Sequence, residues 1–192
     1  MSIAALLFFI RALGLTVPLT IVAGWSAAEA AIFFLVADVP ISWIAVRSGA
    51  KAALLAALVA AVASIVGTIA VLVWASRDPI GAGAVMTALP GIDAQLLTRG
   101  ADIYRHGALD MLAASFTGVP FKLIALEAGK QGGYGLALLA PFLRLPRFVL
   151  VALFVAGVAR MLQGHMDVRR RLMLLTALWV AFYAFYFSVM PG

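Results

Sequence analysis

The strongest constraint on the fold is an apolar run without charged residues that lies between Lys51 and Arg77. The hydrocarbon core of a bilayer is about 30 Å thick and takes roughly 20 apolar residues of helix, so this run is long enough to cross it. Of the whole chain, 65% is hydrophobic and 11% is charged, against about 25% charged in soluble domains. A water-soluble fold is therefore excluded. We expect an all-α integral membrane protein, because helices satisfy their own backbone hydrogen bonds in lipid.

The net charge of +6 does not indicate a nucleic-acid partner, because the basic residues are scattered among apolar runs instead of clustering on one face. The chain has no cysteine, which excludes disulfides and thiolate metal sites. His106 and His165 have no neighbouring ligand residues, and no phosphate-binding loop or nucleophile motif occurs. We expect no metal, no cofactor and no enzymatic activity.

The alternation of apolar runs and polar segments predicts a single membrane domain over residues 1–192. The expected order is a leading helix at 1–24, a first repeat at 25–76, a polar connector at 77–107, a second repeat at 108–162 and a final transmembrane helix at 172–190. Within the connector, residues 92–106 have the pattern of an amphipathic helix on the bilayer surface. The final helix ends in an aromatic band of the kind found at headgroup interfaces.

A weak internal repeat is the most informative pattern in the chain. Residues 39–49 align without gaps to residues 119–129, and Val, Pro, Ile, Ala and Gly recur in register at an offset of 80 residues. The shared breaks are Pro40 and Gly49 in one copy and Pro120 and Gly129 in the other. Chance is the rival explanation, since Ala and Val are common here. A duplication would place the copies in opposite orientations, as two re-entrant or broken hairpins in inverted repeat, which is a transporter architecture.

Eight ionisable residues interrupt the apolar stretches. They are Glu29, Asp38, Arg47, Asp110, Lys122, Glu127, Arg144 and Arg147. At about 2.5 to 3.5 kcal/mol each at a helix centre, they cannot all face lipid. Four are acidic and four are basic, so they either neutralise one another or line water. Arg47 lies near a predicted helix end, where it can reach the aqueous phase.

Arg144 and Arg147 are the candidates for substrate binding, with Lys122 as a third positive charge. A spacing of three puts both guanidinium groups on one helix face, and paired guanidinium groups suit the oxygens of a phosphate. The alternative is that they neutralise Asp110 and Glu127. The four acids, Glu29, Asp38, Asp110 and Glu127, are candidates for proton coupling if they are buried, or else form salt bridges.

Small residues recur at a spacing of four within the uncharged run. They are Ala52, Ala56, Ala60, Ser64 and Thr68. Such a stripe allows a second helix to approach closely, so it predicts packing within the chain, a homo-oligomer or a contact with a membrane-complex partner. An alanine-rich chain also produces such stripes by chance.

The distribution of Lys and Arg predicts the orientation in the membrane. Arg169, Arg170 and Arg171 carry uncancelled positive charge in the loop before the final helix, which favours the cytoplasmic side for that loop. In residues 77–107 the basic residues are cancelled by acids. This connector is therefore expected outside the cytoplasm.

The run Gly118-Val119-Pro120-Phe121-Lys122, followed by Gly129 and by Arg144-x-x-Arg147-Phe148, resembles the DedA family, also called the SNARE-associated or VTT family, and its short YqaA-like branch in particular. The resemblance implies two membrane-embedded hairpins in inverted repeat, a bacterial inner-membrane location, and lipid flipping or scrambling. It also implies an anionic phospholipid or polyprenyl phosphate as cargo, often with dependence on the proton-motive force. Arg144 and Arg147 match the family's arginines; Glu29 and Asp38 match its first-hairpin acids, and Asp110 a second-hairpin acid.

Two functions follow from these observations. The first is a lipid transporter or scramblase that holds a headgroup at Arg144 and Arg147. The second is an accessory subunit that does not transport and that packs against a larger membrane assembly. The second has some support in the first hairpin, where the family's usual acid after the proline is replaced by Ile41-Ser42-Trp43.

Overall fold

The computed structural model describes residues 14–189, and within that range the chain forms helices joined by turns, without strands. The helices are α2 (Thr16–Ala31), α3 (Asp38–Arg77), α4 (Pro79–Thr87), α5 (Ala94–His106), α6 (Ala108–Thr117), α7 (Phe121–Lys130), α8 (Leu136–Leu162) and α9 (Val168–Val189). Three of them, α3, α8 and α9, are long and apolar enough to cross a membrane. The expected class, an all-α membrane protein, is therefore confirmed.

The first hairpin comprises α2, a non-helical break at residues 32–37, and the first part of α3 as far as residue 48. Pro40 lies in the first turn of α3, where its missing N–H removes no intrahelical hydrogen bond. At Gly49 the backbone leaves helical geometry, with φ 79° and ψ −177°. Because a positive φ favours glycine, Gly49 is where the chain turns from the hairpin into the long second part of α3.

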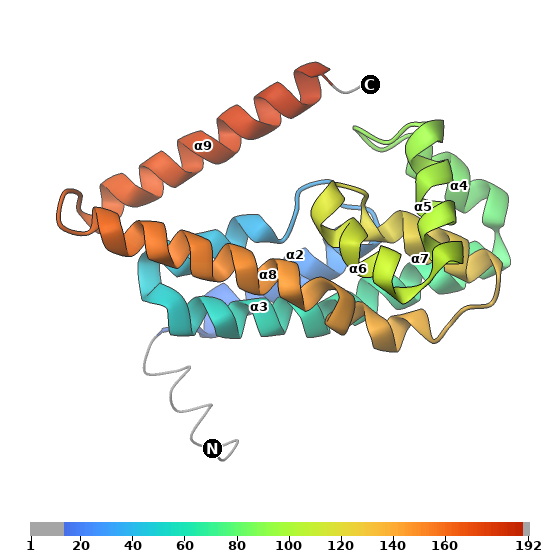
Figure 1. The fold of residues 1–192 in the computed structure, drawn as a ribbon, viewed down its shortest axis with the longest axis horizontal. Coiled ribbons are helices and arrows are strands. Elements are labelled where there is room, and N and C mark those ends of the chain that lie inside the picture. Colours follow the sequence, from blue (N-terminus) through green and yellow to red (C-terminus); the bar gives the residue numbers. More distant parts are fainter. Residues whose placement is uncertain (1–13, 190–192) are drawn as a thin grey trace, which may run out of the picture.

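The second hairpin comprises α6, a break at residues 118–120, and α7. Gly118 takes a left-handed conformation with φ 84°, and Pro120 is the N-cap of α7 in an extended conformation. Gly129, the counterpart of Gly49, stays helical within α7. In Figure 1 the two hairpins occupy opposite ends of the molecule, and their tips approach each other near its middle.

The second part of α3 lies between α2 and α8 and forms one apolar core with them. The small-residue stripe Ala52, Ala56, Ala60, Ser64 and Thr68 is completely buried in this packing, and the Ser26 hydroxyl of α2 donates to the Ala60 carbonyl at 2.7 Å. The stripe therefore serves packing within the chain. The surface of the stripe is thus occupied within the chain, and the expected homo-oligomer or complex partner remains a prediction that the structure does not test.

Two glycines allow helices to approach more closely than any side chain would permit. A Cβ on Gly67 of α3 would overlap the Ala27 carbonyl oxygen of α2 and lie 2.8 Å from the Ala30 Cβ. A Cβ on Gly129 of α7 would lie 2.7 Å from the Leu72 carbonyl oxygen of α3. Both hairpins are thus held directly against the backbone of α3.

The structure corrects some expected boundaries. Helix α2 runs without interruption from Thr16 to Ala31, so the division expected between residues 24 and 25 lies inside one helix, and the start of the leading helix lies outside the described residues. The connector contains α4 in addition to the predicted amphipathic helix, which is α5. Gly100 of α5 is buried against Leu123 of α7. One face of α5 therefore packs on protein.

Replacing Gly67 by alanine tests the close packing of α2 on α3. The new methyl group meets backbone that cannot move aside, so we expect a loss of about 1–3 kcal/mol of stability. Gly24→Ala in α2 is the matched control, because its Cβ would meet nothing within 4 Å and alanine favours helix by up to about 1 kcal/mol. Thermal unfolding in detergent measures both. Equal stability of the two variants would contradict the packing.

Candidate functional site

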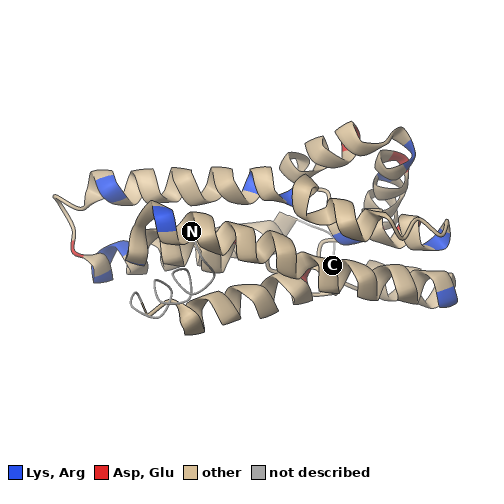
Figure 2. Ribbon diagram, turned by 90° about the horizontal axis from the view of Figure 1, so that it is seen from below, with Lys and Arg blue, Asp and Glu red and all other residues tan. Residues whose placement is uncertain are grey.

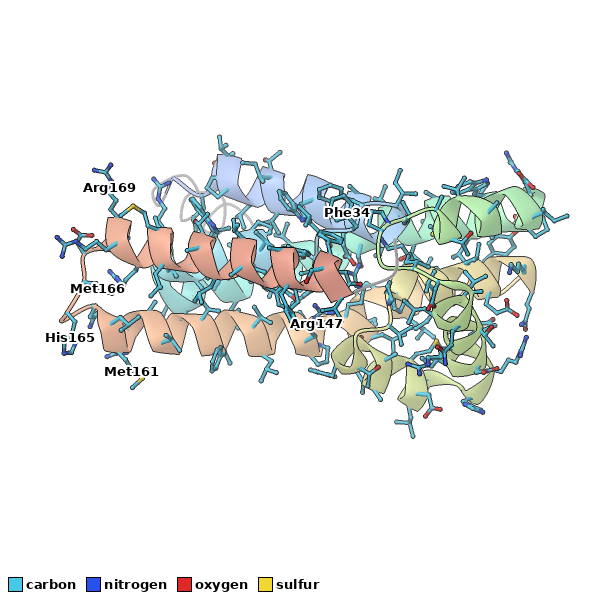
Figure 3. All side chains as sticks on the ribbon, turned by 90° about the horizontal axis from the view of Figure 1, so that it is seen from above. Phe34, Arg147, Met161, His165, Met166 and Arg169 are labelled. Atoms are coloured by element: carbon cyan, nitrogen blue, oxygen red, sulfur yellow. The ribbon has the colours of Figure 1, made fainter. Side chains whose placement is uncertain are left out.

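Helix α8 carries Arg144 and Arg147 into the middle of the molecule, where the hairpin tips meet. Figure 3 shows Arg147 and Phe34, a residue of the first hairpin break, near the middle of the long axis of the molecule, and both residues line one cavity. Pro141 and Pro146 both lie inside α8, and a proline within a helix leaves a backbone carbonyl free. The Ser115 hydroxyl of α6 donates to the Leu143 carbonyl of α8 at 2.9 Å. The second hairpin is therefore anchored to α8 one residue before Arg144.

Arg144 and Arg147 of α8 each pair with an acid of the first hairpin. Arg144 pairs with Glu29, and the two residues are only 6% and 7% exposed. Arg147 donates from Nε to Asp38 Oδ2 at 3.0 Å and from Nη1 to the Ser115 carbonyl at 3.2 Å. One buried and one partly buried ion pair thus connect α8 to both arms of the first hairpin.

The alternative pairing of these arginines with Asp110 and Glu127 is wrong. Asp110 is exposed and lies 3.2 Å from His106 Nδ1. Glu127 lies 3.3 Å from Arg105 and 3.6 Å from Lys130, at the far end of α7. These two acids belong to a separate polar cluster around α5. Of the four acids expected near the arginines, only Glu29 and Asp38 are there.

Lys122 joins the two hairpin tips. Its side chain is 3% exposed, and its Nζ donates to the Phe33 carbonyl in the first hairpin break at 2.6 Å. Among the described residues it makes no ion pair with a carboxylate. The buried group therefore contains three cationic side chains and two carboxylates, which leaves one excess positive charge.

These side chains surround a cavity of about 170 Å³. Its wall includes Glu29, Lys122, Arg144 and Arg147, together with apolar residues from both hairpins. The Arg144 guanidinium lies 5.0 Å from the Phe148 ring centre and 5.7 Å from that of Phe121, close enough for attraction between the cation and the rings. The cavity thus combines an apolar wall with a few fixed polar groups, as binding sites commonly do.

The sequence analysis missed the contribution of α9 to this cavity. Tyr183 and Tyr186 line it, and the Tyr183 hydroxyl accepts from the Val36 N–H at 2.9 Å. One turn earlier, Trp179 Nε1 donates to the Ser42 hydroxyl at 2.9 Å. Trp179, Tyr183 and Tyr186 have the spacing of a single helix face. That spacing within the aromatic band was the signal available in the sequence.

Two polar atoms of the buried ion pairs have no hydrogen-bond partner among the described residues. They are Nη1 of Arg144 and Oδ1 of Asp38. A buried polar atom without a partner costs about 1–3 kcal/mol and usually has a functional or solvent-related reason. One is a donor and the other an acceptor, so the site retains capacity to bind a further polar group. In residues 14–189 no cluster of three or more His, Asp or Glu side chains could hold a metal ion.

Comparison with known proteins gives no relative for this chain. No family model, no curated protein and no solved structure matches it. The DedA resemblance therefore rests on the quoted motifs alone.

The pairing of Arg144 with Glu29 can be tested by a double-mutant cycle. Arg144→Met should cost about 3–5 kcal/mol, because it leaves a buried carboxylate without its counter-ion. Adding Glu29→Gln should recover much of that loss, since both charges are then gone. Adding Asp110→Asn instead should recover nothing, because Asp110 is exposed and remote. Denaturation in mixed micelles measures the free energies, and an additive cycle for positions 29 and 144 would exclude the pairing.

Proposed function

We propose that this protein binds the phosphate headgroup of an anionic membrane lipid in the cavity between its hairpins and moves that lipid across the bilayer, in the manner implied by its resemblance to the DedA family. The observation that carries the proposal is the convergence of Lys122, Arg144 and Arg147 on one buried cavity with only two carboxylates. The excess positive charge favours an anion there.

The chemistry of the site suits a phosphate monoester or diester. Guanidinium groups present donors in a planar fork that matches phosphate oxygens, and Arg144 has a donor atom without a protein partner. The low dielectric of the interior strengthens such contacts. In the absence of lipid, the carboxylates of Glu29 and Asp38 balance the positive charges of Arg144 and Arg147, and a headgroup would compete with these carboxylates for the same donors.

The arrangement of the hairpins supports a mechanism of alternating access. We propose that the first hairpin with α3 and the second hairpin with α8 are inverted repeats, as the offset of 80 residues predicts. Loosening one hairpin tip would then open the cavity toward one face of the membrane, and loosening the other would open it toward the opposite face. Glu29 and Asp38 are the acids in position to exchange protons during this cycle; Asp110 and Glu127 lie too far from the cavity to do so.

The second candidate is an accessory subunit without transport activity. The specific observation in its favour is that both arginines already have carboxylate partners within the chain. In that function the charged group only fixes the fold, and Lys122 locks the two hairpin tips together.

Charge-neutral replacement of one ion pair separates the two candidates. The double variant Arg147→Gln with Asp38→Asn removes an arginine without leaving a buried charge, so the protein should fold. We expect it to lose most movement of fluorescent anionic lipid in reconstituted vesicles, since a charge-assisted contact is worth about 1.5–3 kcal/mol. The matched control is Arg105→Gln with Asp102→Asn, an exposed pair on α5, which should move lipid at the parent rate.

The outcome of this assay decides between transport and assembly. If the double variant at positions 38 and 147 is folded and moves lipid as fast as the parent, Arg147 does not bind the phosphate headgroup and the proposal is refuted. A parent protein that moves no lipid, while it co-purifies in fixed ratio with another membrane protein, supports the accessory subunit.

The proposed location is the bacterial cytoplasmic membrane, with the loop between α8 and α9 in the cytoplasm. Because the chain has no cysteine, single cysteines at Arg170 and at Ile80 report the orientation cleanly; Ile80 is 85% exposed. We expect a membrane-impermeant thiol reagent to label position 80 in intact cells and position 170 only after permeabilisation. The reverse pattern would invert the proposed topology.

A further inference from the structure

A second cavity, of about 590 Å³, lies at the end of the molecule where α8 turns into α9. Its wall comes from α3 around Gly49, from the last turns of α8, and from the start of α9, and it contains Arg47, Arg160 and Arg171. Figure 2 shows Lys and Arg near both ends of the ribbon, including this one. Three guanidinium groups therefore face one hollow that lies apart from the charged cavity between the hairpins.

No carboxylate neutralises these three arginines. All eight Asp and Glu residues of the chain are engaged elsewhere: Glu29 and Asp38 with α8, Asp78 and Asp93 as helix N-caps, Asp102 and Glu127 with Arg105, Asp110 with His106, and Asp167 with Arg170. In the described part of the chain, Arg47 and Arg160 form neither ion pairs nor side-chain hydrogen bonds. The positive charge of this cavity is thus left for an external anion.

Arg171 is held in position to bind such an anion. Its Nη1 donates to the Ala159 carbonyl near the end of α8 at 2.8 Å, which fixes the side chain across the cavity. Its Nε is buried and has no partner among the described residues. A guanidinium that is anchored by one nitrogen and has another free loses little conformational entropy when it binds a ligand.

An apolar groove leads away from the three arginines. Val46, Ala159 and Arg171 line both the basic cavity and a narrower hollow between α8 and α9, whose other lining residues are all apolar. Val155, Leu175 and Leu178 continue from that hollow into a third one, which reaches Arg147 and Phe182. A series of adjoining hollows with shared lining residues therefore extends along α8 and α9 from the basic cavity toward the charged cavity in the middle.

We infer that Arg47, Arg160 and Arg171 bind the phosphate headgroup of a membrane lipid, whose hydrocarbon chain lies in the groove between α8 and α9. The basic cavity matches the anion, and the adjoining apolar groove matches the chain, so a lipid fits the two features better than free phosphate does. The argument for binding at this site rests on the arginines and the groove and does not depend on the proposed function. Its use as the loading position for the central cavity rests on the proposed function.

Native mass spectrometry of the detergent-solubilised protein, titrated with phosphatidic acid, tests the inference. The variant Arg47→Gln with Arg160→Gln should bind this lipid roughly tenfold more weakly, because it loses two guanidinium contacts and contacts of solvent-exposed side chains are weaker than buried ones. Arg171 stays, so its contact with Ala159 is preserved. The matched control is Lys51→Gln with Arg169→Gln, which removes the same charge from the same end but from outside the cavity, and it should bind like the parent.

A second variant tests the groove without changing any charge. Leu178→Trp puts a bulky ring on the wall shared by the two apolar hollows, and Leu178 is 59% exposed, so the fold should tolerate it. We expect this variant to bind phosphatidic acid more weakly than the parent does, and to bind glycerol phosphate as weakly as the parent does. Thermal unfolding checks that every variant is folded.

Several results would overturn the inference. Equal weakening by both double variants would mean that only general surface charge attracts the lipid, and parent-like binding by Arg47→Gln with Arg160→Gln would mean that the arginines do not bind it. Competition by inorganic phosphate at the same concentration as the lipid would identify a free anion as the ligand. If binding behaves as expected but reconstituted vesicles move no lipid, the proposed transport fails while this binding site stands.

Discussion

An arginine inside a helix that crosses a bilayer needs a counter-ion, and here both counter-ions come from the first hairpin. Arg144 and Arg147 lie well within α8, and without partners each would cost at least about 2.5 to 3.5 kcal/mol in lipid. Glu29 and Asp38 meet that need from the two arms of one hairpin. The hairpin is thereby drawn against α8, and the cavity forms where its tip meets that of the second hairpin.

This pairing is possible only because the helices approach closely. The buried stripe of alanine, serine and threonine on α3, and the glycines at 67 and 129, let α2, α7 and α8 lie against the backbone of α3. Larger side chains would push the first hairpin outward and carry its acids out of reach of the arginines. The small residues therefore do not line the charged cavity, but they allow the short distance between helices that its ion pairs need.

The parts of this structure that depend on local sequence could be predicted, and those that depend on long-range pairing could not. Apolar runs and prolines predicted the long helices and the breaks near Pro40 and Pro120, and the amphipathic pattern predicted α5. The partners of the arginines are 115 and 109 residues away in the chain, and no local pattern distinguishes Glu29 and Asp38 from Asp110 and Glu127. The same limit explains why the aromatic band of the final helix predicted only a membrane interface, although Tyr183, which belongs to that band, lines the cavity.

Helix α9 has no buried residue, and within residues 14–189 its side chains form hydrogen bonds with the other helices and their connections through Arg171, Trp179 and Tyr183. Acyl chains can replace most of its contacts with α3 and α8 at little cost, because lipid tails are as apolar as the side chains they would displace. The tilt of this helix therefore depends on the bilayer as well as on the protein. Because the thickness of a bilayer affects the tilt of a helix that crosses it, the same dependence holds for the packing of α9, which brings Tyr183 and Tyr186 to the central cavity.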